Sequence, residues 1–242
     1  MNKTPPPRTI PENLNEAFTC QGRIPVEHCY VDESFFADKP AVYEKDAVDQ
    51  YIRSAHERRQ NYYGITDQYL YQALEQFPIC GLEVGVIGST TPWYESIALA
   101  FGALPTSIDY NKIDSRDARI RSLSLEEYRQ NPVQFDALFS ISSFEHDGLG
   151  RYGDPIRPEG DFSAMEMAKG MLRPGGLLYL ALPVGRDLIL WNCHRVYGAL
   201  RLPRLLQGWE VIGSFGFSMQ DLEQYQDGTT HQPLFICKKP SF

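Results

Sequence analysis

Features that mark several common classes of protein are missing from this sequence of 242 residues. No apolar run approaches the roughly 20 residues that a membrane-spanning helix needs. Residues 1–15 contain no apolar segment of the kind found in secretion signals. A surplus of positive charge is also lacking: the net charge is −8, and phosphate contacts need a basic face. We therefore expect a cytoplasmic protein that neither spans a membrane nor binds nucleic acid.

Paired cysteines are absent as well, since no C-x-x-C pair occurs. The sequence has five scattered cysteines: Cys20, Cys29, Cys80, Cys193 and Cys237. An odd number without pairing favours reduced thiols, most of them packed in the interior. Cys20, His28 and Cys29 lie close together in sequence, but no second ligand pair accompanies them, so we expect no metal site.

The chain divides into two parts. Residues 1–40 are rich in proline and acidic side chains and predict an extended surface arm. Residues 41–77 have the apolar spacing of helices, with Gly64 as the break between them. We expect residues 1–78 to form this arm and a helical appendage, packed on or capping a main domain of residues 79–242.

Strand-like and helix-like segments alternate through the main domain. The predicted strands cover residues 82–87, 105–109, 120–125, 135–143, 177–183, 209–215 and 234–238. The predicted helices cover residues 94–101, a segment ending at Met171 with a capping box of Ser163 and Glu166, and residues 196–206. This alternation predicts an α/β fold, a Rossmann-like open and mostly parallel sheet with helices on both faces.

The segment LEVGVIGSTTPWYE, residues 82–95, begins as a buried strand and runs into a glycine turn. Open α/β sheets bind ligands at the carboxyl ends of their strands. Gly85 and Gly88 allow a tight turn and a close approach of the backbone to a ligand. Asp109 ends the next strand about 20 residues on, where a carboxylate can bind two ribose hydroxyls. These features together predict a cofactor that contains a nucleoside.

Several longer segments carry a resemblance. They are Glu83 to Gly85, Asp109, FDALFSISSFEH at residues 135–146 and LRPGG at residues 172–176. In this order they resemble a class I S-adenosylmethionine-dependent methyltransferase over roughly residues 79–238. More narrowly, GSTTPWYE, EHDGLGRYGDP and NCHRVYG are similar to a methyltransferase-like family of unknown function.

The first loop departs from the superfamily pattern. Ile87 and Ser89 stand where the second and third glycines usually fall. Because the branched Ile87 resists a positive φ, we expect the turn to shift onto Gly88. The cofactor carboxylate would then meet backbone N–H groups or the hydroxyls of Ser89 and Thr90.

The resemblance implies S-adenosylmethionine as cofactor and assigns roles to residues. The predicted cofactor-binding residues are Glu83, Gly85, Gly88, Ser89, Asp109, Tyr110 and Ser143. The predicted substrate-binding residues are Glu145, Arg151, Tyr152, His194 and Arg195. The predicted catalytic residues are His146, Asp147 and Asp154. His146 is the favoured base, because the unperturbed pKa of histidine, about 6.5, lies near working pH.

Structural interpretations of the same residues remain open. Glu145 and His146 can cap the turn after a strand, and residues 151–161 can form a passive surface loop. His194 and Arg195 can simply begin the next helix. Trp93, with Tyr94, is expected to pack beneath the first loop rather than stack on a ligand.

The predicted function is methylation of a small polar acceptor, with a sugar hydroxyl as the specific hypothesis. No Asn/Asp-Pro-Pro-Tyr/Phe motif occurs, which disfavours methylation of a base or amide nitrogen. The alternative is a non-catalytic methyltransferase-like binding or scaffold module, consistent with the altered first loop. A nicotinamide-dependent oxidoreductase is disfavoured, because that turn is not G-x-G-x-x-G and no Tyr-x-x-x-Lys pair occurs. A homodimer is an assembly that the sequence leaves open.

Overall fold

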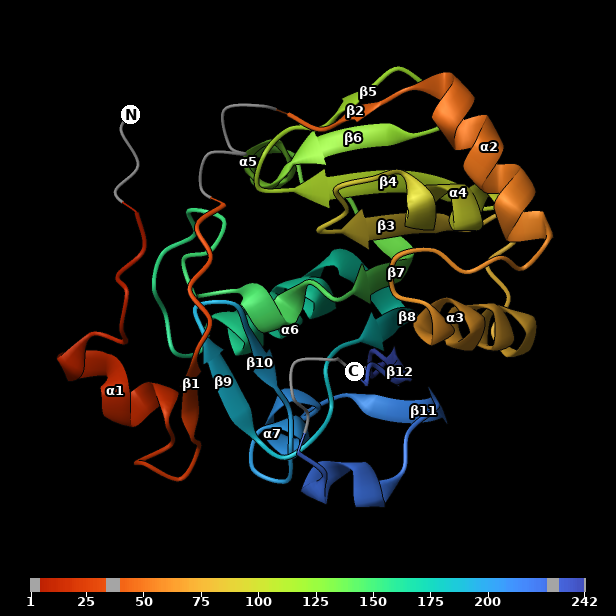
Figure 1. Ribbon diagram of the computed structural model, residues 1–242. Helices are drawn as coiled ribbons and strands as arrows, with labels where there is room; N and C mark the ends of the chain where they lie inside the picture. The colour runs from red at the N-terminus through yellow and green to blue at the C-terminus, as the bar shows by residue number, and fades with distance from the viewer. Residues whose placement is uncertain (1–4, 34–39, 226–230, 242) are drawn as a thin grey trace.

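A seven-stranded sheet forms the centre of the protein in the computed structural model, which describes residues 5–33, 40–225 and 231–241 (Figure 1). Its strands are β3 (Glu83–Ile87), β4 (Leu104–Asp109), β6 (Arg121–Ser124), β7 (Phe135–Ile141), β8 (Leu172–Ala181), β11 (Glu210–Phe215) and β12 (Leu234–Lys238). The order is β11-β12-β8-β7-β3-β4-β6. Neighbouring strands from β6 to β8 are parallel, whereas β12 is antiparallel to both β8 and β11. The predicted α/β class, with an open and mostly parallel sheet, is confirmed.

The strand order reverses in the middle of the sheet. From β3 the chain moves outward through β4 to β6, then returns to the other side of β3 to form β7 and β8. The loops after β3 and β7 therefore lead away in opposite directions. Such a reversal leaves a crevice at the carboxyl ends of the two strands, and ligands bind there in open α/β sheets.

Helices cover both faces of the sheet. One face packs against α2 (Lys45–His56), α3 (Ile65–Gln76) and α4 (Trp93–Ala100). The other packs against α5 (Leu125–Gln130), α6 (Gly160–Met171) and α7 (Leu202–Leu205). Successive residues of β7 divide between the two cores, with Ala137 and Phe139 on the first face and Leu138 on the second. This is the period of two that a strand buried on both faces requires.

Residues 1–78 contain the two expected helices and, in addition, a helix and a strand in the arm. Helices α2 and α3 lie on either side of Gly64, which has a φ of 54°. The arm also folds, because it forms α1 (Glu12–Phe18) and β1 (Val26–His28). Strand β1 joins β9 (Leu188–Trp191) and β10 (His194–Val196) in a second sheet, to the left of the main sheet in Figure 1. Strands β2 (Val42–Tyr43) and β5 (Asp114–Ser115) form a third pair.

The predicted helix at residues 196–206 is wrong. Val196 ends β10, and only the four residues of α7 are α-helical. The Asp187 carboxylate accepts hydrogen bonds from the backbone N–H groups of Gly198 and Arg201, both at 3.0 Å. These hydrogen bonds hold the segment in a loop conformation, and they would be lost if the segment formed a helix.

The predicted capping box of Ser163 and Glu166 is also wrong. Helix α6 already begins at Gly160, so Ser163 lies within it. The Ser163 hydroxyl donates to the carbonyl of Glu159, one turn back, instead of capping the helix. The described residues also form two short 3-10 helices, η2 (Phe144–His146) and η3 (Met219–Glu223).

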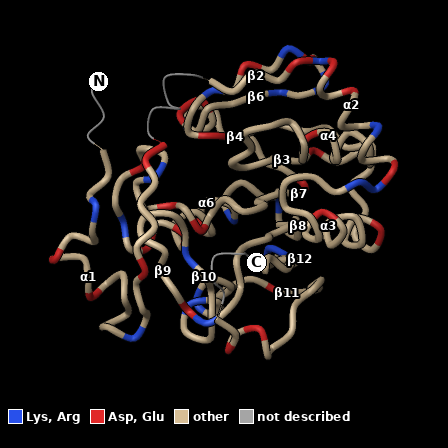
Figure 2. The backbone as a smooth tube through the Cα atoms, viewed as in Figure 1, with Lys and Arg blue, Asp and Glu red and all other residues tan. Residues whose placement is uncertain are grey.

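Figure 2 shows acidic and basic residues interspersed along the backbone. All five cysteines are free thiols; Cys237 is buried, whereas Cys80 is exposed. Among the described residues, no helix is both long and apolar enough to cross a membrane.

Candidate functional site

Gly88 forms the turn at the carboxyl end of β3. Its φ is +73°, and its N–H donates to the carbonyl of Ile108 in β4 at 3.1 Å. A Cβ on this residue would lie 2.1 Å from the hydroxyl oxygen of Ser143, just beyond β7. The turn therefore falls on Gly88, as predicted, and only glycine fits between the two strand ends.

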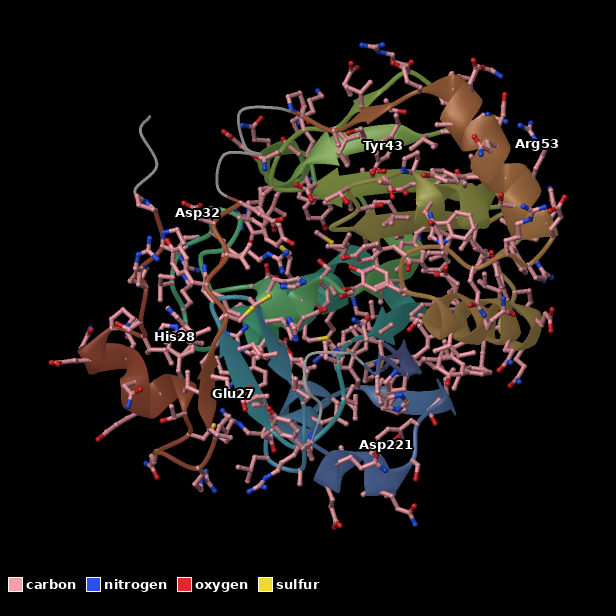
Figure 3. All side chains as sticks on the ribbon, in the orientation of Figure 1. Glu27, His28, Asp32, Tyr43, Arg53 and Asp221 are labelled. Atoms are coloured by element: carbon pink, nitrogen blue, oxygen red, sulfur yellow. The ribbon has the colours of Figure 1, made fainter. Side chains whose placement is uncertain are left out.

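A buried carboxyl group lies beneath this turn. Glu95, in the first turn of α4, accepts a hydrogen bond from the hydroxyl of Ser107 at 2.5 Å, and the hydroxyl oxygens of Ser89 and Tyr43 lie 3.1 Å and 3.3 Å from its carboxyl oxygens. The Tyr43 hydroxyl donates to the Ser89 carbonyl at 2.8 Å; Figure 3 shows Tyr43 near the edge of the sheet formed by β4 and β6. Burial raises the pKa of Glu95 to about 7. Sequence reasoning missed this cluster, since Tyr43 and Glu95 are 52 positions apart.

Glu95 makes stability depend on pH. Because its pKa rises from 4.5 to about 7 on folding, the folded state binds the proton more tightly, and stability falls as the pH rises across that range. The full effect is on the order of 3 kcal/mol. We expect Glu95→Gln to show a shallower decline of unfolding free energy, measured by urea titration at successive pH values. The exposed Glu75→Gln is the control, and parallel curves for both variants would contradict the expectation.

Asp109 and Tyr110 lie at the carboxyl end of β4. Burial raises the pKa of Asp109, whose Oδ1 accepts from the Asn111 N–H at 2.9 Å. Tyr110, about half exposed, lines a cavity of about 260 Å³ together with Asp147 and Arg157. The cavity is bounded by the end of β4, the loop after β7 and the start of α6. Asp109 itself is not among the lining residues, so the room for a small organic group lies one residue beyond it, beside Tyr110.

Glu83 and Gly85 do not lie at this edge, which corrects their prediction as cofactor residues. Glu83 begins β3, and its N–H donates to Asp136 at the opposite end of the sheet. Gly85 pairs within the strand, and a Cβ there would meet Leu138 at 2.5 Å. The strand extends through Ile87, so the turn follows at Gly88, three residues beyond Gly85.

The segment after β7 holds a second buried carboxyl group. Ser142 has a φ of 52°, an uncommon conformation for a residue other than glycine. Its hydroxyl donates to Oε1 of Glu145 at 2.6 Å and accepts from the side-chain amide of Gln232 at 3.1 Å. Burial raises the pKa of Glu145 to about 7. The Tyr63 hydroxyl, which sequence reasoning missed, lies beside both groups, and burial raises its pKa to about 12. Strained backbone of this kind clusters at functional sites.

His146 lies next to Glu145 in an unexpected protonation state. Its Nδ1 is 2.7 Å from the carbonyl of Cys193, and because a carbonyl only accepts, Nδ1 carries the proton. Burial, with nearby Arg151 and His194, lowers the pKa of His146 to about 3. The imidazole is therefore neutral at physiological pH. The sequence argument for His146 as the base assumed an ordinary histidine pKa. With a pKa of about 3 the imidazole is too weak a base for that role.

Other predicted substrate residues gather around His146. Its ring contacts the rings of Tyr152, at a centroid distance of 5.6 Å, and His194, at 6.1 Å. The Arg151 guanidinium lies over Tyr152 and donates to Glu33 of the arm at 2.6 Å. The structure thus brings Glu145, His146, Tyr152, His194 and Arg151 together, and the arm closes the outer side.

Asp154, a predicted catalytic residue, is engaged by its own loop. Its carboxylate accepts from the backbone N–H groups of Gly148 at 2.7 Å, Gly150 at 3.1 Å and Tyr152 at 3.3 Å. These bonds fix the shape of the loop. They favour a structural role for Asp154 over the predicted catalytic one. Asp147 faces the cavity, and burial raises its pKa well above the ordinary value.

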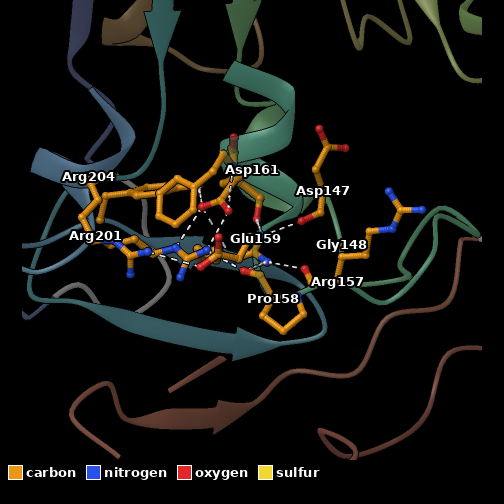
Figure 4. A network of polar contacts seen from close by, with 12 residues as sticks. Asp147, Gly148, Arg157, Pro158, Glu159, Asp161, Arg201 and Arg204 are labelled. Carbon is orange, nitrogen blue, oxygen red and sulfur yellow. Dashed lines mark hydrogen bonds and ion pairs between the residues drawn. The ribbon is translucent and has the colours of Figure 1, made fainter. Parts of the chain in front are cut away.

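Arg195 is fully buried and does not face the cluster, which corrects its prediction as a substrate residue. Its guanidinium donates to the backbone carbonyls of Glu145 at 3.2 Å and Asp147 at 2.7 Å. Asp161 balances its charge and forms a two-bond ion pair with Arg201. Figure 4 shows Asp161 and Arg201 of this network together with Asp147 of the loop after β7. Arg195 thereby binds the backbone on both sides of His146.

The strand order, the helices on both faces and the crevice define the Rossmann-like fold of class I methyltransferases. A solved 1,6-didemethyltoxoflavin-N1-methyltransferase from Burkholderia thailandensis, with 1,6-didemethyltoxoflavin and S-adenosylhomocysteine bound, superposes with a TM-score of 0.57 at 13% identity. The match covers 89% of this chain and 94% of that one. An O-methyltransferase family protein from the same species superposes with a TM-score of 0.49 at 13% identity, over 80% of this chain and 58% of that one. A methyltransferase from Pyrococcus furiosus superposes with a TM-score of 0.42 at 19% sequence identity. The match covers 71% of this chain and 81% of that one.

The family is established by sequence. The model described as "Caenorhabditis protein of unknown function, DUF268" matches residues 81–235, which is more than half of the chain. The protein therefore belongs to the DUF268 family. A search of curated proteins finds no match.

Proposed function

We propose that this protein is an S-adenosylmethionine-dependent methyltransferase that acts on a small polar acceptor. The observation that carries the proposal is the crevice at the strand reversal. There, Gly88 packs against Ser143, and Asp109 ends the neighbouring strand. The Burkholderia thailandensis methyltransferase of the same fold was crystallised with S-adenosylhomocysteine, the demethylated form of this cofactor.

The residues at the crevice fit the parts of the cofactor. Asp109 would accept hydrogen bonds from the ribose hydroxyls, and the cavity beside Tyr110 would take the adenine. The absent Cβ of Gly88 lets the methionine end approach the backbone N–H groups near Ser89. When bound, the cofactor supplies an activated methyl group, and the protein has to align the acceptor with it and exclude water.

The acceptor would bind in the polar cluster beyond β7. Ser142, Glu145, His146 and Tyr152 offer hydroxyl, carboxyl and imidazole groups within one enclosed region. Such groups suit a hydroxyl-bearing acceptor better than an apolar one, since buried polar groups need hydrogen-bond partners. We therefore propose O-methylation, with a sugar hydroxyl as the specific acceptor.

A non-catalytic module of the same fold is the second candidate. Two observations favour it: Ile87 and Ser89 replace the usual glycines, and Glu145 is fully buried beneath the arm. This candidate predicts that substitutions of Glu145 leave the protein's biological role unchanged.

Calorimetric titration with S-adenosylmethionine and S-adenosylhomocysteine tests the proposal. We expect binding in the micromolar range, weakened roughly 10- to 100-fold by Asp109→Ala, because charge-assisted hydrogen bonds to the ribose are lost. Asp46→Ala, which removes an exposed carboxylate from the first turn of α2, is the control and should bind normally. No heat of binding to the intact protein would overturn the proposed cofactor, and the non-catalytic module would then be favoured.

A further inference from the structure

Two hydrogen-bond acceptors in the cluster beyond β7 lie together. One is Oε2 of Glu145, a fully buried atom for which the described residues supply no hydrogen-bond partner. The other is Nε2 of His146. It is unprotonated because the ring hydrogen is on Nδ1, which donates a hydrogen bond to the backbone carbonyl of Cys193. Nε2 lies 3.7 Å from the other Glu145 oxygen, too far for a hydrogen bond.

These two atoms cannot satisfy each other. An ionised carboxylate and a bare imidazole nitrogen both accept, and neither supplies a hydrogen. A buried acceptor left unpaired costs roughly 1–3 kcal/mol. The pair is therefore suited to a ligand that brings two O–H donors, spaced closely enough to reach two neighbouring acceptors.

We propose that the methyl acceptor is a vicinal diol whose two hydroxyls donate to Glu145 and His146, and that Glu145 takes the proton of the hydroxyl that is methylated. This inference rests on the proposed function and names its substrate class. As the new O–C bond forms, the S–C bond of the cofactor breaks and its electron pair stays on sulfur. The hydroxyl proton passes to the Glu145 carboxylate, while His146 keeps its proton on Nδ1 and holds the second hydroxyl.

The surroundings of Glu145 suit a proton acceptor. Ser142 holds its other oxygen at 2.6 Å, which fixes the carboxylate plane. The charged and titratable groups that act on it are Arg151, Arg195, Tyr63, Tyr152, Tyr197 and Asp147, with His146 adjacent. Burial raises its pKa to about 7, close to working pH, whereas that of His146 falls to about 3. Glu145 therefore replaces His146 as the base.

The site would also discriminate between a vicinal diol and a ligand with a single hydroxyl. A monohydroxy ligand leaves one of the two acceptors without a partner, and the penalty is largest when that acceptor is the fully buried Glu145 Oε2. The Tyr152 ring and the Arg151–Glu33 pair enclose the cluster, so a bound diol would be shielded from bulk water.

Direct binding tests the inference without the cofactor. Saturation-transfer NMR would compare cis-1,2-cyclohexanediol and methyl α-D-mannopyranoside with cyclohexanol. We expect both compounds with a vicinal diol to bind the intact protein and cyclohexanol not to bind. Glu145→Gln should weaken diol binding roughly tenfold, because it replaces a charge-assisted bond with a neutral one. Glu166→Gln, an exposed glutamate of α6, is the matched control.

Transfer of labelled methyl groups to the bound diol, followed against pH, gives the second measurement. Intact protein should show a rate that rises through about pH 7 as Glu145 ionises, and Glu145→Gln should lose that rise. Equal binding of diol and cyclohexanol, or no diol binding to the intact protein, would overturn the diol site. An unchanged pH profile in Glu145→Gln would overturn its role as base. Diol binding without cofactor binding would instead contradict the proposed function and leave the diol site standing.

Discussion

Replacing Gly88 with alanine is expected to abolish cofactor binding and to lower the melting temperature by roughly 5–10 °C. The new Cβ would lie 2.1 Å from the Ser143 hydroxyl oxygen and 2.8 Å from its Cβ, and the φ of +73° disfavours any side chain. Strain and overlap together cost about 2–3 kcal/mol, which corresponds to this shift for a chain of this size. The turn would move away from the crevice. Calorimetry and thermal unfolding measure the two effects.

Two further variants separate the effect of the overlap with Ser143 from that of the positive φ. Gly170→Ala adds a methyl group to α6, where no atom lies within 4 Å, so it should leave both quantities unchanged or slightly raise stability. The double variant Gly88→Ala/Ser143→Gly removes the overlap but keeps the positive φ, so it should recover part of the lost stability. If Gly88→Ala alone binds the cofactor as tightly as the intact protein, the turn is not part of the binding site.

Replacing Asp161 with alanine is expected to destabilise the protein by about 3–5 kcal/mol, because two buried guanidinium groups would lose their counter-charge. Arg195 and Arg201 are at most 2% exposed, and Asp161 pairs with both. Burial alone would raise the pKa of Asp161, but the two arginines outweigh it and lower that pKa. Urea unfolding at neutral pH measures the loss.

Tyr197→Phe is the matched control for this network. It removes a single hydrogen bond to Asp161, at 3.0 Å, and should cost only about 1 kcal/mol. Asp161→Ala should also loosen the loop that carries Glu145, seen as faster amide exchange there. A loss below about 1 kcal/mol for Asp161→Ala would mean that the arginines do not depend on this carboxylate.

The sequence predicts the sheet well because its evidence is local. Apolar runs mark β3, β7 and β8, glycines flank β3, and Asp109 is visible as an acid at a strand end. The turn at Gly88 follows from the inability of Ile87 to adopt a positive φ. Each of these inferences needs only neighbouring residues and the period of a strand.

The errors arise where long-range contacts decide. The segment at residues 196–206 has the spacing of a helix, but Asp187 binds its N–H groups from outside. His146 has the pKa that its burial dictates, and Arg195 points into a network with Asp161 rather than toward a ligand. Glu95 was overlooked because its partner Tyr43 comes from the appendage. No local pattern encodes such pairings.

The docking of the arm gives the protein an internal optical probe. Trp191 packs edge-on against Phe18 at 5.3 Å, and its indole N–H donates to the carbonyl of Pro7 at 3.0 Å. The other two tryptophans, Trp93 and Trp209, belong to the cores on the two faces of the main sheet. With both changed to phenylalanine, the emission of Trp191 would follow release of the arm, separately from melting of the sheet. Opening of the arm can thereby be timed by fluorescence.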